Sequence, residues 1–145
     1  MDTQPLFRPA FHSQRCLVVV DGFYEWQRVG RGKVPHFIHL RSERPFALAG
    51  LWQNRTCAVI TCAPNALLAP IHNRMPVIVP RRAYDVWLDP ARGNAAELRA
   101  LLTPYAPDEM NARPVSPLVN SPSNDGVECT IPLAREGRTL VLRLQ

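Results

Sequence analysis

Glu25 is the first residue of this chain whose surroundings suit proton transfer. It lies in the segment DGFYEW (residues 21–26), between Tyr24 and Trp26. Large aromatic neighbours shield a carboxylate from water, which raises its pKa toward the range useful for acid–base catalysis. A glutamate that only points outward from a surface strand could have the same local sequence. Both interpretations of Glu25 remain open at this point.

His72 is the second candidate for proton transfer. It lies in the segment IHNRMPV (residues 71–77), two residues before Arg74 and bracketed by Pro70 and Pro76. Because proline fixes φ, this loop is expected to be stiff and to aim its side chains reproducibly. A histidine beside an arginine suits acid catalysis next to a phosphate. A hydrogen-bonded structural histidine is the alternative.

Other polar and aromatic residues could contact a nucleic acid. Trp26 could stack on a base, and Thr61 could line a pocket, although threonine is also an ordinary strand residue. Trp52 and Trp87 have periodic apolar neighbours, so we assign both to the core. A basic segment could follow a phosphate backbone or could be a solvated turn; it contains Arg28, Arg31 and Lys33.

The histidines and cysteines do not indicate a metal site. His36 and His39 are three residues apart, so they face opposite sides of a strand and cannot chelate one ion. The four cysteines contain no CxxC pair, and we predict that all are small buried hydrophobic residues without disulfides: Cys16, Cys57, Cys62 and Cys129. No metal and no cofactor is expected.

The bulk properties indicate one globular domain over residues 1–145. Hydrophobic residues make up 46% of the 145 residues, which suffices for a core. The formal charge is +5, from 17 basic and 12 acidic side chains. The abundant arginine indicates phosphate recognition or simply a GC-rich genome. The sequence shows neither a membrane-spanning run nor a signal peptide, so we expect a cytoplasmic protein, and we expect a monomer.

The apolar pattern predicts an α+β fold. Strands are expected at residues 16–20, 34–40, 46–52, 57–63, 127–131 and 139–144. The five-residue link 41–45 suggests a hairpin between its neighbouring strands, and a turn around Glu136-Gly137 joins the last two. Helices are expected at residues 81–88 and 95–102, the second with Asn94 as its N-cap. Residues 105–124 are predicted to be an ordered loop.

The order of these segments resembles the SOS-response-associated peptidase family. The similarity runs from about Pro5 to Pro132. Besides DGFYEW and IHNRMPV, it includes Arg15-Cys16-Leu17, residues 47–52, Ile60-Thr61, Asn65, Pro114-Val115-Ser116 and Val119-Asn120. The resemblance implies a strongly curved, barrel-like, mainly antiparallel sheet with peripheral helices.

The resemblance also implies a function and a set of site residues. The family traps abasic sites in single-stranded DNA through a covalent protein–DNA cross-link, and it has self-cleaving peptidase activity. By similarity, Glu25 is the acid/base at the amino terminus, and His72 is the acid that protonates the opened deoxyribose. Trp26, Thr61 and Arg74 match positions that line the DNA groove.

One departure from the family concerns its nucleophile. The family uses a cysteine directly after the initiator methionine, whose amine and thiol together close a thiazolidine ring on the abasic aldehyde. This chain has Asp2 there, and an internal residue such as Cys16 has no free amine. Asn111-Ala112-Arg113 repeats a family tripeptide that belongs further upstream, and we interpret it as coincidence. We therefore expect an N-terminally truncated member that lacks the family's first strands.

Whether the chain is an enzyme stays open, although the resemblance favours one. The alternatives are a non-covalent module that binds single-stranded DNA and an inactive remnant. A steep salt dependence without a denaturation-stable product would indicate the module.

Overall fold

Short strands, three α-helices and several 3-10 helices make up the described part of the chain. The computed structural model describes residues 8–91 and 94–133. The elements are α1 (Arg8–Ser13), β1 (Arg15–Val20), β2 (Phe23–Val29), β3 (Gly32–Leu40), β4 (Phe46–Gln53), β5 (Thr56–Val59), β6 (Thr61–Cys62), β7 (Met75–Pro76), β8 (Ile78–Val79), η1 (Arg81–Ala83), α2 (Tyr84–Leu88), α3 (Ala95–Ala100), η2 (Pro107–Glu109), β9 (Met110–Pro114), η3 (Pro117–Asn120) and η4 (Val127–Thr130).

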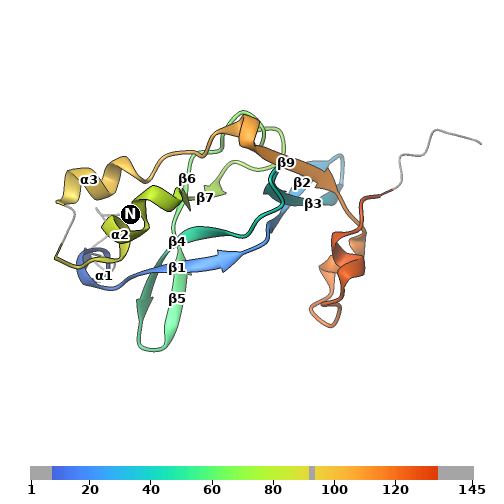
Figure 1. Cartoon of the computed structure of the whole chain (residues 1–145). Coiled ribbons are helices and arrows are strands. Elements are labelled where there is room, and N and C mark those ends of the chain that lie inside the picture. The colour runs from blue at the N-terminus through green and yellow to red at the C-terminus, as the bar shows by residue number, and fades with distance from the viewer. Residues whose placement is uncertain (1–7, 92–93, 134–145) are drawn as a thin grey trace, which may run out of the picture.

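The strands pair in three antiparallel groups. The first sheet has the order β1-β4-β5, and β8 also pairs with β4. The second sheet has the order β2-β3-β9, and β6 pairs with β7. The helices gather at one end of the molecule, and β2, β3 and β9 lie at the other (Figure 1). The expected α+β class with mainly antiparallel pairing is confirmed, whereas closure into a barrel stays a prediction.

The chain passes between the two larger sheets three times, after β1, β3 and β8, and the second passage corrects one expectation. β3 and β4 do not form the predicted hairpin. Instead, β3 pairs with β2 and β9, while β4 pairs with β1, β5 and β8. The link 41–45 therefore carries the chain from one sheet to the other. Apolar alternation shows where a strand lies, but it does not show which strand becomes its neighbour.

Gly22 makes the first crossing possible. It follows β1 and precedes β2, where the backbone passes close to β3. A Cβ atom at this position would lie 2.6 Å from the carbonyl oxygen of Ile38 and would also overlap the ring of Phe37. Only glycine therefore fits at this corner, and the corner brings the DGFYEW segment onto the second sheet.

The core has two parts, and β4 contributes to both. Residues 46–51 of β4 are buried, and successive side chains of a strand point to opposite faces. Ala49 and Leu51 pack with Trp87 beneath the helices. Phe46 and Leu48 pack with Ile38, Met75 and Met110 toward the second sheet. β4 thus fixes the two sheets relative to each other.

The helices agree with the expected pattern. Residues 81–88 form η1 followed by α2, and Trp87 on α2 is buried as expected. The Asn94 side chain accepts a hydrogen bond of 2.9 Å from the Glu97 amide, which confirms the N-cap of α3. No helix in the described part of the chain is long and apolar enough to span a membrane.

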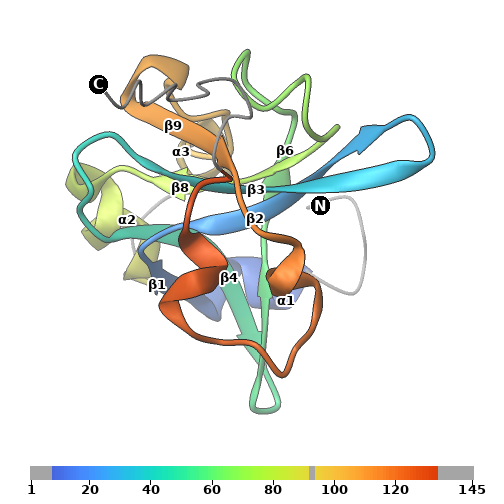
Figure 2. The same cartoon turned by 90° about the vertical axis from the view of Figure 1, so that its right-hand side faces the viewer.

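Two predicted segments differ from the structure, and a third lies outside the described residues. Residues 105–124 are not only loop, because β9 lies within them and pairs with β3. Asn111-Ala112-Arg113 is the centre of that strand, so the tripeptide has a structural place here. Residues 127–130 form the 3-10 helix η4 rather than a strand (Figure 2). The expected strand 139–144 and the turn at Glu136-Gly137 lie outside the described residues.

The buried-residue predictions were wrong for Trp52 and for most cysteines. Trp52 lies near the end of β4 and is 48% exposed. Cys129 is buried, whereas Cys57 is exposed and Cys16 and Cys62 are partly buried. Each of these positions is near the end of a short strand or at a sheet edge, where sequence alternation overstates burial.

Candidate functional site

Glu25 and His72 come together from separate parts of the chain. Glu25 Oε2 on β2 lies 3.5 Å from Nδ1 of His72, which is in the loop between β6 and β7. The Glu25 side chain is 20% exposed and the His72 side chain is 42% exposed. Burial raises the pKa of Glu25 above its ordinary value, and the charge on His72 acts in the opposite direction. Glu25 is thus partly shielded from water, as one of its two interpretations expected, but its neighbours Tyr24 and Trp26 lie on the other face of β2 and are not the cause.

The imidazole of His72 is oriented by the backbone of its own loop. Its Nδ1 lies 3.0 Å from the carbonyl oxygen of Arg74, in addition to the Glu25 carboxylate. Because two acceptors face Nδ1, we assign the proton of the neutral ring to that nitrogen; the Arg74 amide is at the longer distance of 3.3 Å. Nε2 is then the nitrogen available for exchanging a proton with a bound molecule.

Arg74 is held against Thr61 on the neighbouring strand. Its Nε donates to Thr61 Oγ1 at 2.8 Å, and its Nη2 donates to the Thr61 carbonyl oxygen at 2.6 Å. Both residues belong to the short β6–β7 pair or its connecting loop. A guanidinium fixed on one side and exposed on the other presents its remaining N–H groups to an anion.

Trp26 points to a different face from Glu25. Side chains alternate along β2, so Glu25 and Gln27 share one face and Trp26 shares the other with Tyr24. The indole Nε1 of Trp26 donates to Asn120 Oδ1 at 2.7 Å. The structure therefore brings Glu25, His72, Arg74 and Thr61 together but sets Trp26 apart. β2 is an edge strand of its sheet, so its two faces are joined along an edge that pairs with no other strand of that sheet.

Gln27 is a site residue that the sequence analysis missed. Its Nε2 donates to the carbonyl oxygen of Pro70 at 3.1 Å. This bond ties β2 to the His72 loop from the same face as Glu25. The two-residue spacing between Glu25 and Gln27 was the available signal, because it places both side chains on one face of a strand.

Asn65 supports the same loop from inside. It is 7% exposed, and its Oδ1 accepts hydrogen bonds from the amides of Leu67 (3.1 Å) and Leu68 (3.0 Å). Its Nδ2 donates to the Tyr105 carbonyl oxygen at 2.8 Å. The Leu68 carbonyl in turn accepts the His72 amide at 2.9 Å. The position of His72 thus depends on a buried hydrogen-bond network.

Cys16 on β1 and Cys62 on β6 are not activated as nucleophiles. Burial, with a smaller contribution from the Cys57 thiol, raises the pKa of Cys16 to about 11. Burial also raises the pKa of Cys62, although nearby Arg74 opposes this. Both thiols therefore stay protonated at neutral pH, and a protonated thiol is a weak nucleophile.

The histidines of β3 are structural. His36 and His39 are both buried, and each Nδ1 lies near a backbone carbonyl oxygen, at 3.1 Å and 2.9 Å respectively. Within residues 8–91 and 94–133, no group of three or more His, Cys, Asp or Glu side chains is arranged to hold a metal ion. The chemistry that the described residues support is proton transfer beside a bound anion.

The sequence profile of the SOS response associated peptidase (SRAP) family matches residues 1–122. This match covers most of the chain. The chain belongs to the SRAP family.

Named relatives of this SRAP chain share one description. Abasic site processing protein YoqW of Bacillus subtilis (strain 168) is 41% identical over 138 residues, which cover 88% of this chain and 62% of that protein. Abasic site processing protein HMCES of Gallus gallus is 32% identical over 154 residues, which cover 86% of this chain and 45% of that protein. This SRAP chain therefore spans less than two thirds of the length of these relatives.

A solved structure supports the SRAP fold. A crystal structure of a protein from Bacteroides thetaiotaomicron aligns with a TM-score of 0.82 and 27% identity, covering 92% of this chain and 62% of that chain. The SRAP membership and the expected α+β class with mainly antiparallel sheets are confirmed, whereas closure into a barrel stays a prediction. The individual roles of Glu25, His72, Trp26, Thr61 and Arg74 stay predictions.

Proposed function

We propose that this chain processes abasic sites in single-stranded DNA and forms a covalent cross-link to them, with Glu25 and His72 as its proton-transfer pair. The general part rests on membership of a family whose relatives are called abasic site processing proteins. The specific part rests on one observation. A partly buried carboxylate and an accessible imidazole lie 3.5 Å apart, although they are distant in sequence.

The chemistry of the proposal is the condensation of an amine with an aldehyde. The amine attacks C1′ of the ring-opened deoxyribose and forms a carbinolamine, and loss of water gives the imine. In our proposal Glu25 accepts a proton from the attacking amine, which the resemblance places at the amino terminus. In the form with a proton on both ring nitrogens, His72 donates the Nε2 proton to the oxygen of the opened sugar and returns to the neutral ring with its proton on Nδ1. In the family a thiol on the same residue as the amine closes a thiazolidine ring, but Asp2, which stands in that place here, has no thiol.

Arg74 and Thr61 supply the anion contact in this proposal. The exposed side of the Arg74 guanidinium would bind a phosphate that flanks the abasic sugar, while Thr61 keeps the guanidinium in place. Trp26 would stack on a neighbouring base at the free edge of β2. Self-cleavage of a leading peptide would use the same carboxylate. The working form is proposed to be a cytoplasmic monomer.

The test is a denaturing gel of labelled single-stranded DNA with one abasic site, incubated with the purified chain. A slow-migrating band that survives denaturation is expected. Glu25→Gln and His72→Ala should each slow its appearance by about 100-fold or more, as expected for the loss of a general acid or base. Glu97→Gln and His12→Ala change exposed groups of the same types elsewhere and serve as controls.

Equal rates in the variants and the controls would disprove the roles of Glu25 and His72. A second outcome would support a different function. If the unaltered chain retains DNA only in native gels, and salt releases it, the chain is a non-covalent module that binds single-stranded DNA.

A further inference from the structure

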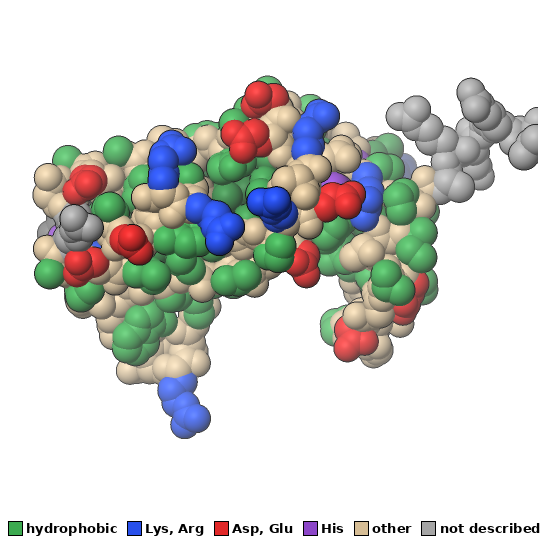
Figure 3. Space-filling view, in the orientation of Figure 1, with side chains coloured by type: hydrophobic (Ala, Val, Ile, Leu, Met, Phe, Trp, Pro, Cys, Tyr) green, Lys and Arg blue, Asp and Glu red, His purple; other side chains and the backbone are tan. Residues whose placement is uncertain are grey.

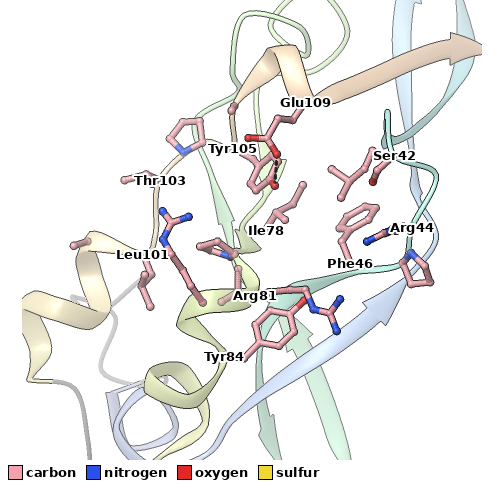
Figure 4. Close-up of a pocket in the computed structure, with 18 residues that line it drawn as sticks. Ser42, Arg44, Phe46, Ile78, Arg81, Tyr84, Leu101, Thr103, Tyr105 and Glu109 are labelled. Carbon is pink, nitrogen blue, oxygen red and sulfur yellow. Dashed lines mark hydrogen bonds between the residues drawn. The ribbon is translucent and has the colours of Figure 1, made fainter.

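A cleft outside the Glu25–His72 site is not used by the proposed function. Its cavity volume is about 550 Å³. Three segments form its walls: the link between β3 and β4, the segment from β8 to α2, and the segment from α3 to η2 (Figure 4). None of the lining residues belongs to the Glu25–His72 site.

Arginine side chains surround this cleft. Arg44 comes from the β3–β4 link, and Arg81 and Arg82 come from η1; all three are exposed. In Figure 4 the side chains of Arg44 and Arg81 extend toward one another. Within the described part of the chain, none of the three forms an ion pair with an acidic side chain. Figure 3 shows basic side chains spread across the middle of this face.

Apolar and aromatic side chains form the interior of the cleft. Phe46 and Ile78 are buried and lie at its base. Tyr84 and Tyr105 are partly exposed and belong to different walls. Partly exposed aromatic rings beside cations suit an unstacked base joined to phosphates, because every base has a π-face and every phosphodiester a negative charge.

Among the described residues, Glu109 is the one acidic residue that lines the cleft, and it accepts a hydrogen bond from a neighbour. The Tyr105 hydroxyl donates to Glu109 Oε2 at 2.9 Å. Burial and this contact together raise the pKa of Tyr105 to about 12, so its phenol stays neutral at working pH. Three cations thus face one carboxylate, and the balance favours an anionic ligand.

We propose that this cleft is a second nucleic-acid contact, which holds one nucleotide of single-stranded DNA away from the reacting sugar. Arg44 and Arg81 bind one phosphate between them, and Arg82 meets the next phosphate beside Tyr105. The base lies against the ring of Tyr84. This inference deepens the proposed function, because a damaged strand needs points of attachment that do not depend on the damage.

The first test measures binding of an undamaged, fluorescein-labelled oligothymidylate by anisotropy over a range of salt concentrations. The triple variant Arg44→Ala/Arg81→Ala/Arg82→Ala should bind roughly tenfold more weakly at moderate salt. The slope of log K against log salt should become shallower by about 1.4, that is, about 0.7 for each of two lost phosphate contacts on a single strand.

A matched control removes one positive charge at a distant point. Arg55 lies at the exposed β4–β5 turn with a φ of 66°, a conformation that asparagine tolerates, so Arg55→Asn is the control. This variant should keep the salt slope of the unaltered chain. Glu109→Gln should change affinity in the other direction and tighten binding about twofold to threefold. Thermal unfolding of each variant shows that it is folded.

A second test locates the base. The oligonucleotide carries 5-iododeoxyuridine, and irradiation followed by peptide mapping identifies the attached residue. Attachment to Tyr84 or Tyr105 supports the proposal. Attachment only to Trp26, with equal affinity for the triple variant and Arg55→Asn, overturns it. A free deoxynucleoside monophosphate that competes at the same concentration as the oligonucleotide would also overturn it, because the cleft would then bind a nucleotide rather than a strand.

These tests are independent of the cross-linking gel. The oligothymidylate used for anisotropy has no abasic site. If the triple variant binds it as tightly as the unaltered chain, the nucleic-acid contact at the cleft is disproved and the roles of Glu25 and His72 are unaffected. Conversely, if the salt slope depends on the arginines but the denaturing gel shows no cross-linked band, the covalent reaction is disproved and the nucleic-acid contact at the cleft is supported.

Discussion

Glu25 couples the candidate site to the stability of the fold. Burial disfavours its ionised form and raises its pKa in the folded protein, with the His72 charge opposing. An acid whose folded pKa exceeds its unfolded value contributes stability that is fully present below the unfolded pKa. That contribution is lost as pH rises through the folded pKa.

A neutral replacement should therefore stabilise the protein in a pH-dependent way. Glu25→Gln should have nearly the same melting temperature as the unaltered chain below the ordinary glutamate pKa of 4.5. At neutral pH the variant should have a higher melting temperature than the unaltered chain, because glutamine carries no charge whose burial costs free energy. Thermal melts across this range provide the measurement, with Glu97→Gln as control. A variant that melts lower at neutral pH would contradict the prediction.

At this scale the sequence predicted the chemistry of single residues but not their partners. The prolines around His72 are local, so their effect could be deduced from adjacent positions. The burial of Glu25 could not, because Tyr24 and Trp26 lie on the other face of β2. The bond from Gln27 to the Pro70 carbonyl joins distant segments, and only the fold reveals it. The separation of Trp26 from Glu25 follows from strand alternation and was available from the sequence.

The loop between β6 and β7 is the element on which His72 depends. The Asn65 side chain accepts hydrogen bonds from two backbone amides of this loop, those of Leu67 and Leu68, and donates one to the Tyr105 carbonyl. Asn65→Ala would leave buried backbone groups without partners and should destabilise the protein by about 2–3 kcal/mol. It should also slow cross-linking, because the His72 amide bonds to this turn through Leu68. Urea unfolding and the denaturing gel measure the two effects.

Asn73→Ala is the matched control for this loop. Asn73 is exposed and next to His72, so its loss should change stability by less than about 0.5 kcal/mol. Equal destabilisation by both substitutions would show that Asn65 has no special role.

The elements themselves were only partly predictable, because helix caps such as Asn94 have local signals whereas β9 has none. Its short segment contains charged and polar residues and becomes a strand only by pairing with β3.

At the scale of the whole molecule, the fold depends on a few connections between distant segments. Buried Arg15 donates to the carbonyl oxygens of Phe11 (2.8 Å) and Asp89 (2.7 Å), and Trp87 Nε1 donates to the Cys16 carbonyl at 2.8 Å. These bonds fasten α1 and α2 to β1. The sequence predicted that Trp87 is buried, but the cage of carbonyl groups around Arg15 requires the folded backbone.

The position of β3 between β2 and β9 has a consequence for how the protein folds and is made. Pairing of residues 36–40 with residues 110–114 is strongly non-local, and such topologies fold in milliseconds to seconds rather than microseconds. Stopped-flow refolding followed by tryptophan fluorescence should show this; microsecond folding would contradict it.

During synthesis at about 5–20 residues per second, β9 emerges several seconds after β3. For that interval one edge of β3 is open, so the nascent chain presents a β-strand edge on which chaperones or neighbouring chains can act.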